Sequence, residues 1–312
     1  MKKALPHTLA LITIVIWSST FVVTKYLLEY FSPTAILIYR FFISIILLFI
    51  IYPKFHKPQK LTHELYFLGA GLSGITGYFL LQNIALSYTS ATNVGIISGI
   101  VPIVTLLSSF IAFKTPKISW NFVLGFFIAI SGIILITLNG AFELKLNPLG
   151  DILAILAMVS WGIYGVFLKL LTDLGYQGTT MTRHIMEYGF IFLIPAFFIT
   201  KSSFNFNAFT DYKVVLSLLF LALFASTLAF LLWNYSCQRI STVTTNIYLY
   251  LSPLISTLFS FIFLKEKITL FIIIGMILSI IGLLVSSNFT INFIKKLFNF
   301  NKNNIDEEKG SD

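Results

Sequence analysis

The side chains best able to do chemistry are a few charged groups that interrupt long apolar stretches. Arg183 and His184 precede Glu187 by four and three residues, so one helical face would carry a cation, a base and an acid. Within a membrane such a carboxylate can carry a coupling proton or neutralise a cationic solute. Alternatively, Arg183 and Glu187 form a purely structural ion pair. We take Glu187, Arg183 and His184 as coupling candidates.

Two polar faces repeat each other. Thr76, Phe79 and Asn83 are spaced to share one helical face, and the same three residue types return 151 positions later. Amides buried in hydrocarbon need partners. Two such faces related by a repeat axis would line a common cavity, although interhelical hydrogen bonds that only stabilise the bundle are the alternative. The second face is Thr227, Phe230 and Asn234.

Two tryptophans, Trp17 and Trp161, lie in the middle of apolar stretches and not at their ends. Each indole N–H needs an acceptor there, and each ring is a platform for a planar or cationic solute. Ordinary aromatic packing is the alternative, because 16% of the chain is aromatic. The other candidate pocket-lining residues are Tyr78, Gln82, Tyr164, Trp233, Asn246, Tyr248 and Tyr250.

Catalytic and cofactor motifs are weak by comparison. The stretch from Gly69 to Gly74 spells GxGxxG, but it lies inside an apolar span and close helix packing explains the glycines. Ser73 with His184 would form a serine hydrolase dyad only if the two side chains met. No HExxH, P-loop or Cys/His metal cluster occurs in the sequence. We therefore expect no catalytic residue, no metal and no cofactor, with an intramembrane serine hydrolase as a remote alternative.

The elements that must position these groups are membrane helices. Apolar residues make up 57% of the chain and charged residues 11%, so lipid must be the solvent for much of the surface. A spanning helix needs about 20 apolar residues. The predicted spans are 7–28, 34–52, 66–86, 92–113, 119–138, 150–171, 180–200, 214–236, 242–263 and 269–287.

The last five spans repeat the first five. Besides the polar faces, Trp17 aligns with Trp161, and Pro102 with Pro253. Five crossings invert the second copy, and inverted repeats that meet at the membrane midplane are typical of alternating-access transporters. We expect an all-α polytopic membrane protein of ten transmembrane helices, built as two inverted five-helix repeats around a central cavity. The repeats would be residues 1–143 and 144–290, followed by a partly disordered cytoplasmic tail, 291–312.

Within these repeats, Pro102 and Pro253 each remove one backbone hydrogen bond and are hinge candidates. Stripes of small residues, such as Gly69, Ser73 and Gly77, predict close helix contacts. Spans five and ten are expected at the lipid-facing periphery, holding the repeats together.

The basic residues set the expected orientation. The net charge of +9 comes from lysines and arginines in short loops, a placement that favours the positive-inside rule over nucleic-acid binding. With the N-terminus inside, fourteen of the 21 Lys and Arg residues are cytoplasmic and seven are external. Both termini should then be cytoplasmic. Lys25, Arg40, Lys169 and Arg183 lie near span ends and are expected to reach an interface.

Several short strings occur in a characteristic order in both halves. Those of the first half are Trp17-Ser18-Ser19-Thr20-Phe21 with Lys25, Ser32-Pro33, Tyr39-Arg40-Phe41, Ala85 to Ala91 leading to Pro102, and Gly125 with Gly132. Those of the second half are Trp161, Ser241, Pro253, Lys265-Glu266-Lys267, Gly275 and Gly282.

In order, spacing and duplication, these strings resemble the EamA-type, ten-span branch of the drug/metabolite transporter superfamily over about residues 8–288. The resemblance implies inverted repeats around a central cavity, cytoplasmic termini, and movement of amino acids, related metabolites or drug-like solutes, often outward. One departure is that Lys114 to Lys117 lacks the acidic residue common after span four, whereas Glu266 keeps it after span nine.

We therefore expect a multi-pass secondary transporter of a bacterial cytoplasmic membrane that exports amino acids or related small metabolites. An importer of an organic cation or amine is the alternative. Its partners would be a small-molecule solute, the lipid bilayer and, as a candidate coupling ion, protons. The sequence leaves the substrate, direction, coupling ion and oligomeric state open.

Overall fold

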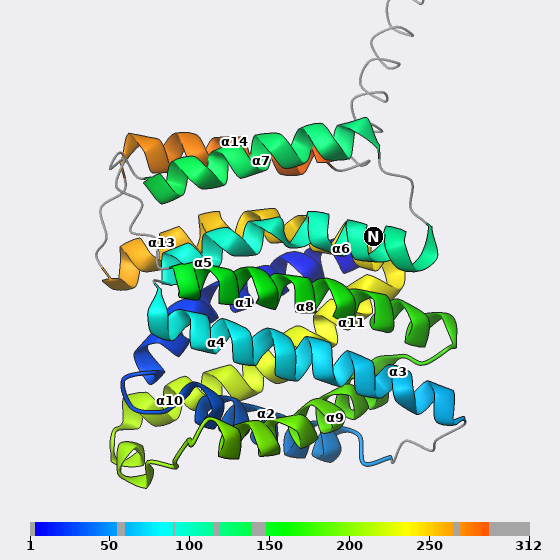
Figure 1. Ribbon diagram of the computed structural model, residues 1–312, viewed down its shortest axis with the longest axis vertical. Helices are drawn as coiled ribbons and strands as arrows, with labels where there is room; N and C mark the ends of the chain where they lie inside the picture. Colours follow the sequence, from blue (N-terminus) through cyan, green and yellow to red (C-terminus); the bar gives the residue numbers. More distant parts are fainter. Residues whose placement is uncertain are drawn as a thin grey trace, which may run out of the picture.

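A computed structural model describes residues 4–54, 60–89, 91–114, 119–138, 148–264 and 269–286, and all regular secondary structure in these ranges is helical. The helices lie side by side in one bundle (Figure 1). The predicted tail, 291–312, and the loop residues 115–117 and 265–267 lie outside the described residues.

Each predicted span of the first half is helical, with ends within a few residues of the prediction. Apolar runs set the helices, and local signals set their ends: Ser32 caps the helix that starts at Pro33, accepting a hydrogen bond from the Ala35 amide at 3.3 Å. The elements are α1 (Leu5–Leu27), α2 (Pro33–Ile51), α3 (Leu61–Gly71), η1 (Leu72–Gly77), α4 (Tyr78–Tyr88), α5 (Ala91–Ile97), η2 (Ser98–Ile100), α6 (Val101–Phe113) and α7 (Trp120–Leu138).

The second half follows the same order, with one additional short turn between its second and third spans. Asp211 caps the third span, accepting a hydrogen bond from the Lys213 amide at 2.8 Å. The elements are α8 (Pro148–Asp173), α9 (Gly178–Ile199), η3 (Phe206–Thr210), α10 (Tyr212–Phe220), η4 (Leu221–Leu228), α11 (Ala229–Ile240), α12 (Thr242–Ile247), η5 (Tyr248–Leu251), α13 (Ser252–Leu264) and α14 (Leu270–Ser286).

Irregular turns occur at matching places in the two halves. The third span of each half contains a π-helical segment, η1 or η4, and these segments hold the aligned residues Thr76 and Thr227. The fourth span of each half contains a 3₁₀ segment, η2 or η5, just before the aligned Pro102 and Pro253. π-Helical turns are rare and concentrate at functional sites. The duplication in the sequence is therefore repeated in the backbone.

Small residues bring the helices together, as the stripes predicted. A Cβ on Gly74 would overlap the Tyr164 ring, and one on Gly77 would overlap the Ser160 hydroxyl, so α8 packs closely against η1. At one edge of the bundle α7 packs along α14 (Figure 1). There Gly132 and Gly282 allow backbone to approach backbone. Spans five and ten thus contact each other across the two halves, as expected.

Six helical stretches among the described residues are long and apolar enough to cross a membrane: Leu5–Leu27, Pro33–Ile51, Leu61–Tyr88, Pro148–Asp173, Tyr212–Ile240 and Thr242–Phe263. Shorter apolar helices accompany them. The described part of the chain is thus all-helical, with a pattern of helices typical of a polytopic membrane protein.

Candidate functional site

An aromatic cluster forms at the centre of the bundle, where the two repeat-related tryptophans meet. Trp17 of α1 and Trp161 of α8 pack edge to face, with their ring centroids 5.2 Å apart and their planes at 89°. Edge-to-face packing is the favoured geometry for aromatic pairs. The other rings of this cluster, called the aromatic box below, are Tyr78, Phe79, Tyr164, Phe230 and Trp233.

Both indole N–H groups have the acceptors that the sequence required. Trp17 donates to the Ala225 carbonyl of η4 at 3.0 Å, and Trp161 donates to Oδ1 of Asn246 on α12 at 3.0 Å. Asn246 is itself fixed, because its Nδ2 donates to the Thr242 carbonyl at 2.8 Å. Each tryptophan is therefore oriented by a helix of the second half.

A small cavity of about 20 Å³ opens against the box. That volume holds about one water molecule, so the cavity in this conformation is too small for an amino acid or a similar solute. Side chains from both halves line it: Trp17, Thr20, Phe21, Tyr78, Phe79, Gln82, Ser98, Val101, Trp161, Leu249 and Ser252. Of these, Trp17, Tyr78, Phe79, Gln82 and Trp161 were predicted from the sequence.

The two 3₁₀ segments form part of the cavity wall. Ser98 of η2 and Leu249 of η5 both line it, and the two segments contact each other. Sequence reasoning missed these residues, although the aligned prolines that follow each segment are a signal for irregular backbone there. A tight turn next to the cavity gives each half a point at which its fourth span can change direction.

The two Thr–Phe–Asn faces divide into rings that enter the box and polar groups that do not line the cavity. Phe79 and Phe230 lie with ring centroids 5.9 Å apart. Thr76 donates to the Gly189 carbonyl at 2.8 Å, and Asn83 donates to the Pro33 carbonyl at 3.3 Å. These are interhelical hydrogen bonds of the kind that stabilise a bundle.

The polar groups of the second face are also engaged between helices. Thr227 donates to the Ala222 carbonyl and lies 2.8 Å from the Ser44 hydroxyl of α2. Asn234 accepts from Tyr164 at 2.8 Å and donates to Thr182 at 2.9 Å, which links α11 to α8 and α9.

Two further predicted lining residues, Tyr248 and Tyr250, make other contacts that the structure describes. Tyr248 meets His7 through its hydroxyl, at 2.6 Å from Nδ1. Tyr250 is fully buried in a separate apolar cluster with Leu106 and Phe122. Tyr248 also packs against the apolar core that contains Trp161 and Trp233. A role for both tyrosines in the solute path stays a prediction.

Arg40, which we expected to reach an interface, is instead buried next to the box with 1% of its surface exposed. Its Nε donates to Ser226 of η4 at 2.7 Å, and its Cζ lies 4.6 Å from the centroid of the Phe79 ring. Within the described part of the chain, Nη2 of Arg40 has no hydrogen-bond partner. None of the ion pairs found among the described residues includes Arg40. A buried cation without an anion is costly, and a bound anion can supply the missing counter-ion.

The coupling candidates form a polar cluster around His184, separate from the box in the contacts described. Nδ1 of His184 lies 3.0 Å from Glu187 and its Nε2 lies 2.8 Å from Glu64. Glu187 also pairs with Nε of Arg183 at 3.1 Å and is 34% exposed. Glu64 was missed because the predicted span began at residue 66, whereas α3 begins at Leu61.

Arg183 and Lys25 donate hydrogen bonds to backbone carbonyls at or just beyond the C-terminal ends of helices. Arg183, 1% exposed, donates to the carbonyls of Tyr52 and Lys54 beyond the end of α2, and Lys25 donates to those of Leu86 and Thr89 at the end of α4. Basic groups at helix C-termini satisfy orphan carbonyls.

No serine hydrolase dyad forms. Ser73 donates to the Gly69 carbonyl at 2.6 Å, whereas both ring nitrogens of His184 face carboxylates. A nucleophile needs its base within reach. Nor does any group of three or more His, Cys, Asp or Glu among the described residues have the geometry to hold a metal ion.

Comparison with known proteins gives a transporter family. The sequence pattern of the EamA-like transporter family matches twice, over residues 5–138 and 148–288. An uncharacterized transporter of Archaeoglobus fulgidus is 28% identical over 286 residues, which are 90% of this chain and 96% of that protein. The uncharacterized transporter YyaM of Bacillus subtilis is 29% identical, over 86% of this chain and 89% of that protein.

One relative carries a more specific name. A probable terminal-alkyne amino-acid exporter of Streptantibioticus cattleyicolor is 24% identical, over 90% of this chain and 92% of that protein. Among solved structures, one crystal structure matches with a TM-score of 0.72 at 17% identity, covering 90% of this chain and 99% of its own. That match shows a shared fold.

Proposed function

The chain belongs to the EamA-like transporter family, and on that premise we propose that it is a secondary transporter that exports amino acids or related small metabolites by alternating access. The box and its cavity would be the solute site. The relative named as a probable amino-acid exporter agrees with this substrate class.

The proposed architecture is ten spans in two inverted repeats, residues 1–143 and 144–290, in a bacterial cytoplasmic membrane with both termini cytoplasmic. Two separate family matches, the aligned tryptophans and the matching irregular turns support the repeats. The bias of fourteen cytoplasmic against seven external basic residues supports the orientation.

Transport requires the small cavity to enlarge. The cavity borders η2 and η5, and Pro102 and Pro253 follow these turns directly. We propose that the two prolines act as hinges, one per repeat, so that the fourth spans open the cavity alternately to either side. The edge-to-face contact of Trp17 with Trp161 would close it between steps.

The observation that carries the substrate class is Arg40. Its Cζ lies 4.6 Å from the centroid of the Phe79 ring, and Phe79 is one of the residues that line the cavity. Rotation of that ring would expose Nη2 to the site. An arginine recognises a carboxylate with charge-assisted hydrogen bonds. A solute with a carboxylate and an apolar or aromatic body would fit Arg40 and the box together.

An organic cation is the alternative solute, because tryptophan and tyrosine rings attract cations. Arg40 opposes it: a second positive charge placed beside a buried guanidinium would be repelled in a medium of low dielectric constant. The amine importer is therefore the weaker proposal on these contacts.

The test is solute efflux from proteoliposomes that contain the purified protein and labelled solutes. Amino acids should leave, and the corresponding decarboxylated amines should not. Arg40→Gln should weaken apparent affinity for amino acids about 10- to 100-fold, since a hydrogen bond to a charged group contributes about 1.5–3 kcal/mol. Arg40→Lys should retain part of the affinity.

Arg183→Gln is the matched control, because Arg183 is equally buried but is bound to backbone carbonyls. It should lower thermal stability and leave the preference for acids over amines intact. If Arg40→Gln is well folded and moves amino acids with unchanged affinity, Arg40 is not the carboxylate site. If the wild-type protein moves only amines, the substrate class is wrong.

A further inference from the structure

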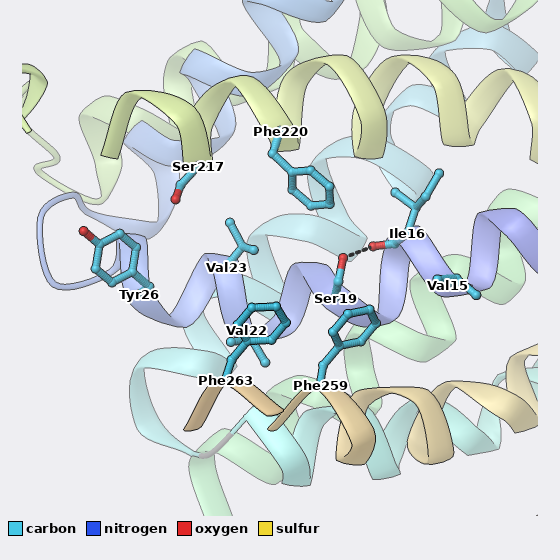
Figure 2. A pocket seen from close by; sticks show the side chains of 10 residues that line it. All are labelled: Val15, Ile16, Ser19, Val22, Val23, Tyr26, Ser217, Phe220, Phe259 and Phe263. Atoms are coloured by element: carbon cyan, nitrogen blue, oxygen red, sulfur yellow. Dashed lines mark hydrogen bonds between the residues drawn. The ribbon is translucent and has the colours of Figure 1, made fainter. Parts of the chain in front are cut away.

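An apolar groove of about 430 Å³ lies along α1 (Figure 2). Helical spacing puts its α1 residues on the side of that helix opposite Trp17. Phe220 points into it from α10, and Phe259 and Phe263 reach it from α13. The Ser19 hydroxyl, which faces the groove, donates to the Ile16 carbonyl of the same helix at 2.7 Å. The other lining residues are Val15, Val22, Val23, Tyr26 and Ser217.

The groove arises from a difference between the repeats. Phe220 stands where the aligned residue of the other half is Gly69, and Phe259 stands where that half has Ser108. At the equivalent interface of α8 with α3 and α6, Gly69 lets the Phe167 ring of α8 pack directly against α3, and Ser108 lies against Gly162 of α8. At the groove, Phe220 of α10 and Phe259 and Phe263 of α13 line the space beside α1, while α13 also contacts α1 through the hydroxyls of Ser252 and Ser18, 3.0 Å apart.

The groove has the length of one membrane leaflet. Its lining runs along α1 from Val15 to Tyr26, a separation of eleven residues that rises about 17 Å. The hydrocarbon core of a bilayer is about 30 Å thick. Exposed walls at this depth face hydrocarbon: Val15 is 44% exposed and Phe263 is 66% exposed.

The end of the groove near Tyr26 is polar and carries one acidic and one basic residue. The Tyr26 hydroxyl lies 3.5 Å from Oδ2 of Asp211, which caps α10. Lys213 is exposed and precedes the groove residue Ser217 by four positions, so the two residues share one face of α10. Tyr212 beside it is 68% exposed, and tyrosine and lysine are typical of the lipid headgroup region.

From these observations we propose that the groove binds one phospholipid, with an acyl chain between α1, α10 and α13 and an anionic headgroup at Lys213. By the charge bias, this phospholipid belongs to the outer leaflet. The lipid would fill the space that Phe167 of α8 fills at the equivalent interface, and would let α1 move relative to α10 and α13 without exposing a void.

The test fills the groove with the side chains that the other repeat uses. Val23→Phe and Ser19→Ile copy the aligned Phe167 and Ile163. The protein is reconstituted in nanodiscs of equal parts phosphatidylcholine and phosphatidylglycerol, and retained lipids are counted by native mass spectrometry after release into detergent. The double variant should retain one phospholipid fewer per protein than the wild type.

Two controls separate this site from general lipid contact. Leu11→Phe enlarges an exposed residue of α1 outside the groove and should retain the wild-type number. Lys213→Glu should abolish the preference for phosphatidylglycerol, whereas Lys201→Glu, the same change in the loop before η3, should not. Val22→Trp fills the groove from another position if the double variant does not fold.

Equal lipid retention in the wild type and in a folded, filled variant would overturn the proposal. If the filled variant keeps its lipid but loses transport, the groove holds a solute instead. If it keeps its lipid but changes its oligomeric state, the groove holds a second copy of the chain. These outcomes are independent of the amino-acid assignment, which the efflux measurements test separately.

Discussion

Trp17 and Trp161 occupy equivalent positions in the two copies of the sequence, and their rings pack edge to face at 5.2 Å. Their hydrogen bonds differ: Trp17 binds a backbone carbonyl at 3.0 Å, whereas Trp161 binds the side chain of Asn246 at 3.0 Å. In this pseudo-symmetric pair, Trp17 is therefore held by a backbone group and Trp161 by a side-chain amide that a mutation can remove.

This difference predicts separable effects at Trp161. Trp161→Phe keeps a ring but loses the hydrogen bond, so apparent solute affinity should fall about 2- to 10-fold, equivalent to about 0.5–1.5 kcal/mol. Trp161→Ala should also lower stability by about 3–5 kcal/mol. Efflux and thermal unfolding in detergent check both. Trp120→Ala, at an 83% exposed position, is the control; equal effects at both tryptophans would contradict a special role for the box.

Asn234 and Asn83 should differ although the sequence pairs them. Asn234 bonds with both Tyr164 and Thr182, whereas the described side-chain bond of Asn83 is one contact with the Pro33 carbonyl. Asn234→Ala leaves the buried Tyr164 hydroxyl without its described partner, whereas Thr182 keeps its bond to the Gly178 carbonyl. The change should destabilise the protein by about 1–3 kcal/mol, more than Asn83→Ala does. Thermal unfolding ranks them. If both variants instead keep normal stability and lose apparent solute affinity about 5- to 150-fold, the two amides contact the solute. That loss corresponds to about 1–3 kcal/mol of binding free energy.

The polar cluster predicts where coupling to protons would reside. Glu64 and Glu187 lie on either side of His184, while Arg183 and Tyr188 bond to one carboxylate each. If this cluster exchanges a proton, Glu187→Gln and Glu64→Gln should each abolish accumulation driven by a pH gradient but spare solute-for-solute exchange.

Asp173→Asn is the control for that experiment, since Asp173 pairs with Lys169 at 2.6 Å on the exposed end of α8. Gradient-driven accumulation that persists in both glutamine variants would leave the cluster as a structural link between α3 and α9.

Cysteine labelling in intact cells tests the orientation. In a Cys237→Ser background, single cysteines at positions 145 and 213 should react with an impermeant maleimide, and those at 57 and 296 should react only after permeabilisation. The reason is the excess of basic residues on the proposed cytoplasmic side. External labelling at position 57 would refute the inverted-repeat orientation.

The sequence by itself determined the elements and their duplication. Apolar runs of about 20 residues have one stable form in lipid, the helix, because every backbone group must be bonded internally. The alignment of Trp17 with Trp161 and of Pro102 with Pro253 was therefore enough to place these residues in equivalent spans, but it did not predict the 3₁₀ turns. The resemblance to a transporter family, carried by the same residues, is confirmed by the family match.

Only the tertiary structure decided what each polar side chain contacts. Helical spacing placed Thr76, Phe79 and Asn83 on one face, but the neighbouring helices decided that the ring enters the box and that the polar groups bond to backbone. Arg40 seemed near an interface by its position, yet packing of α2 against η4 buried it beside Phe79. Periodicity fixes a residue's face on its own helix. What lies opposite that face depends on contacts between residues far apart in the chain, and no local pattern encodes them.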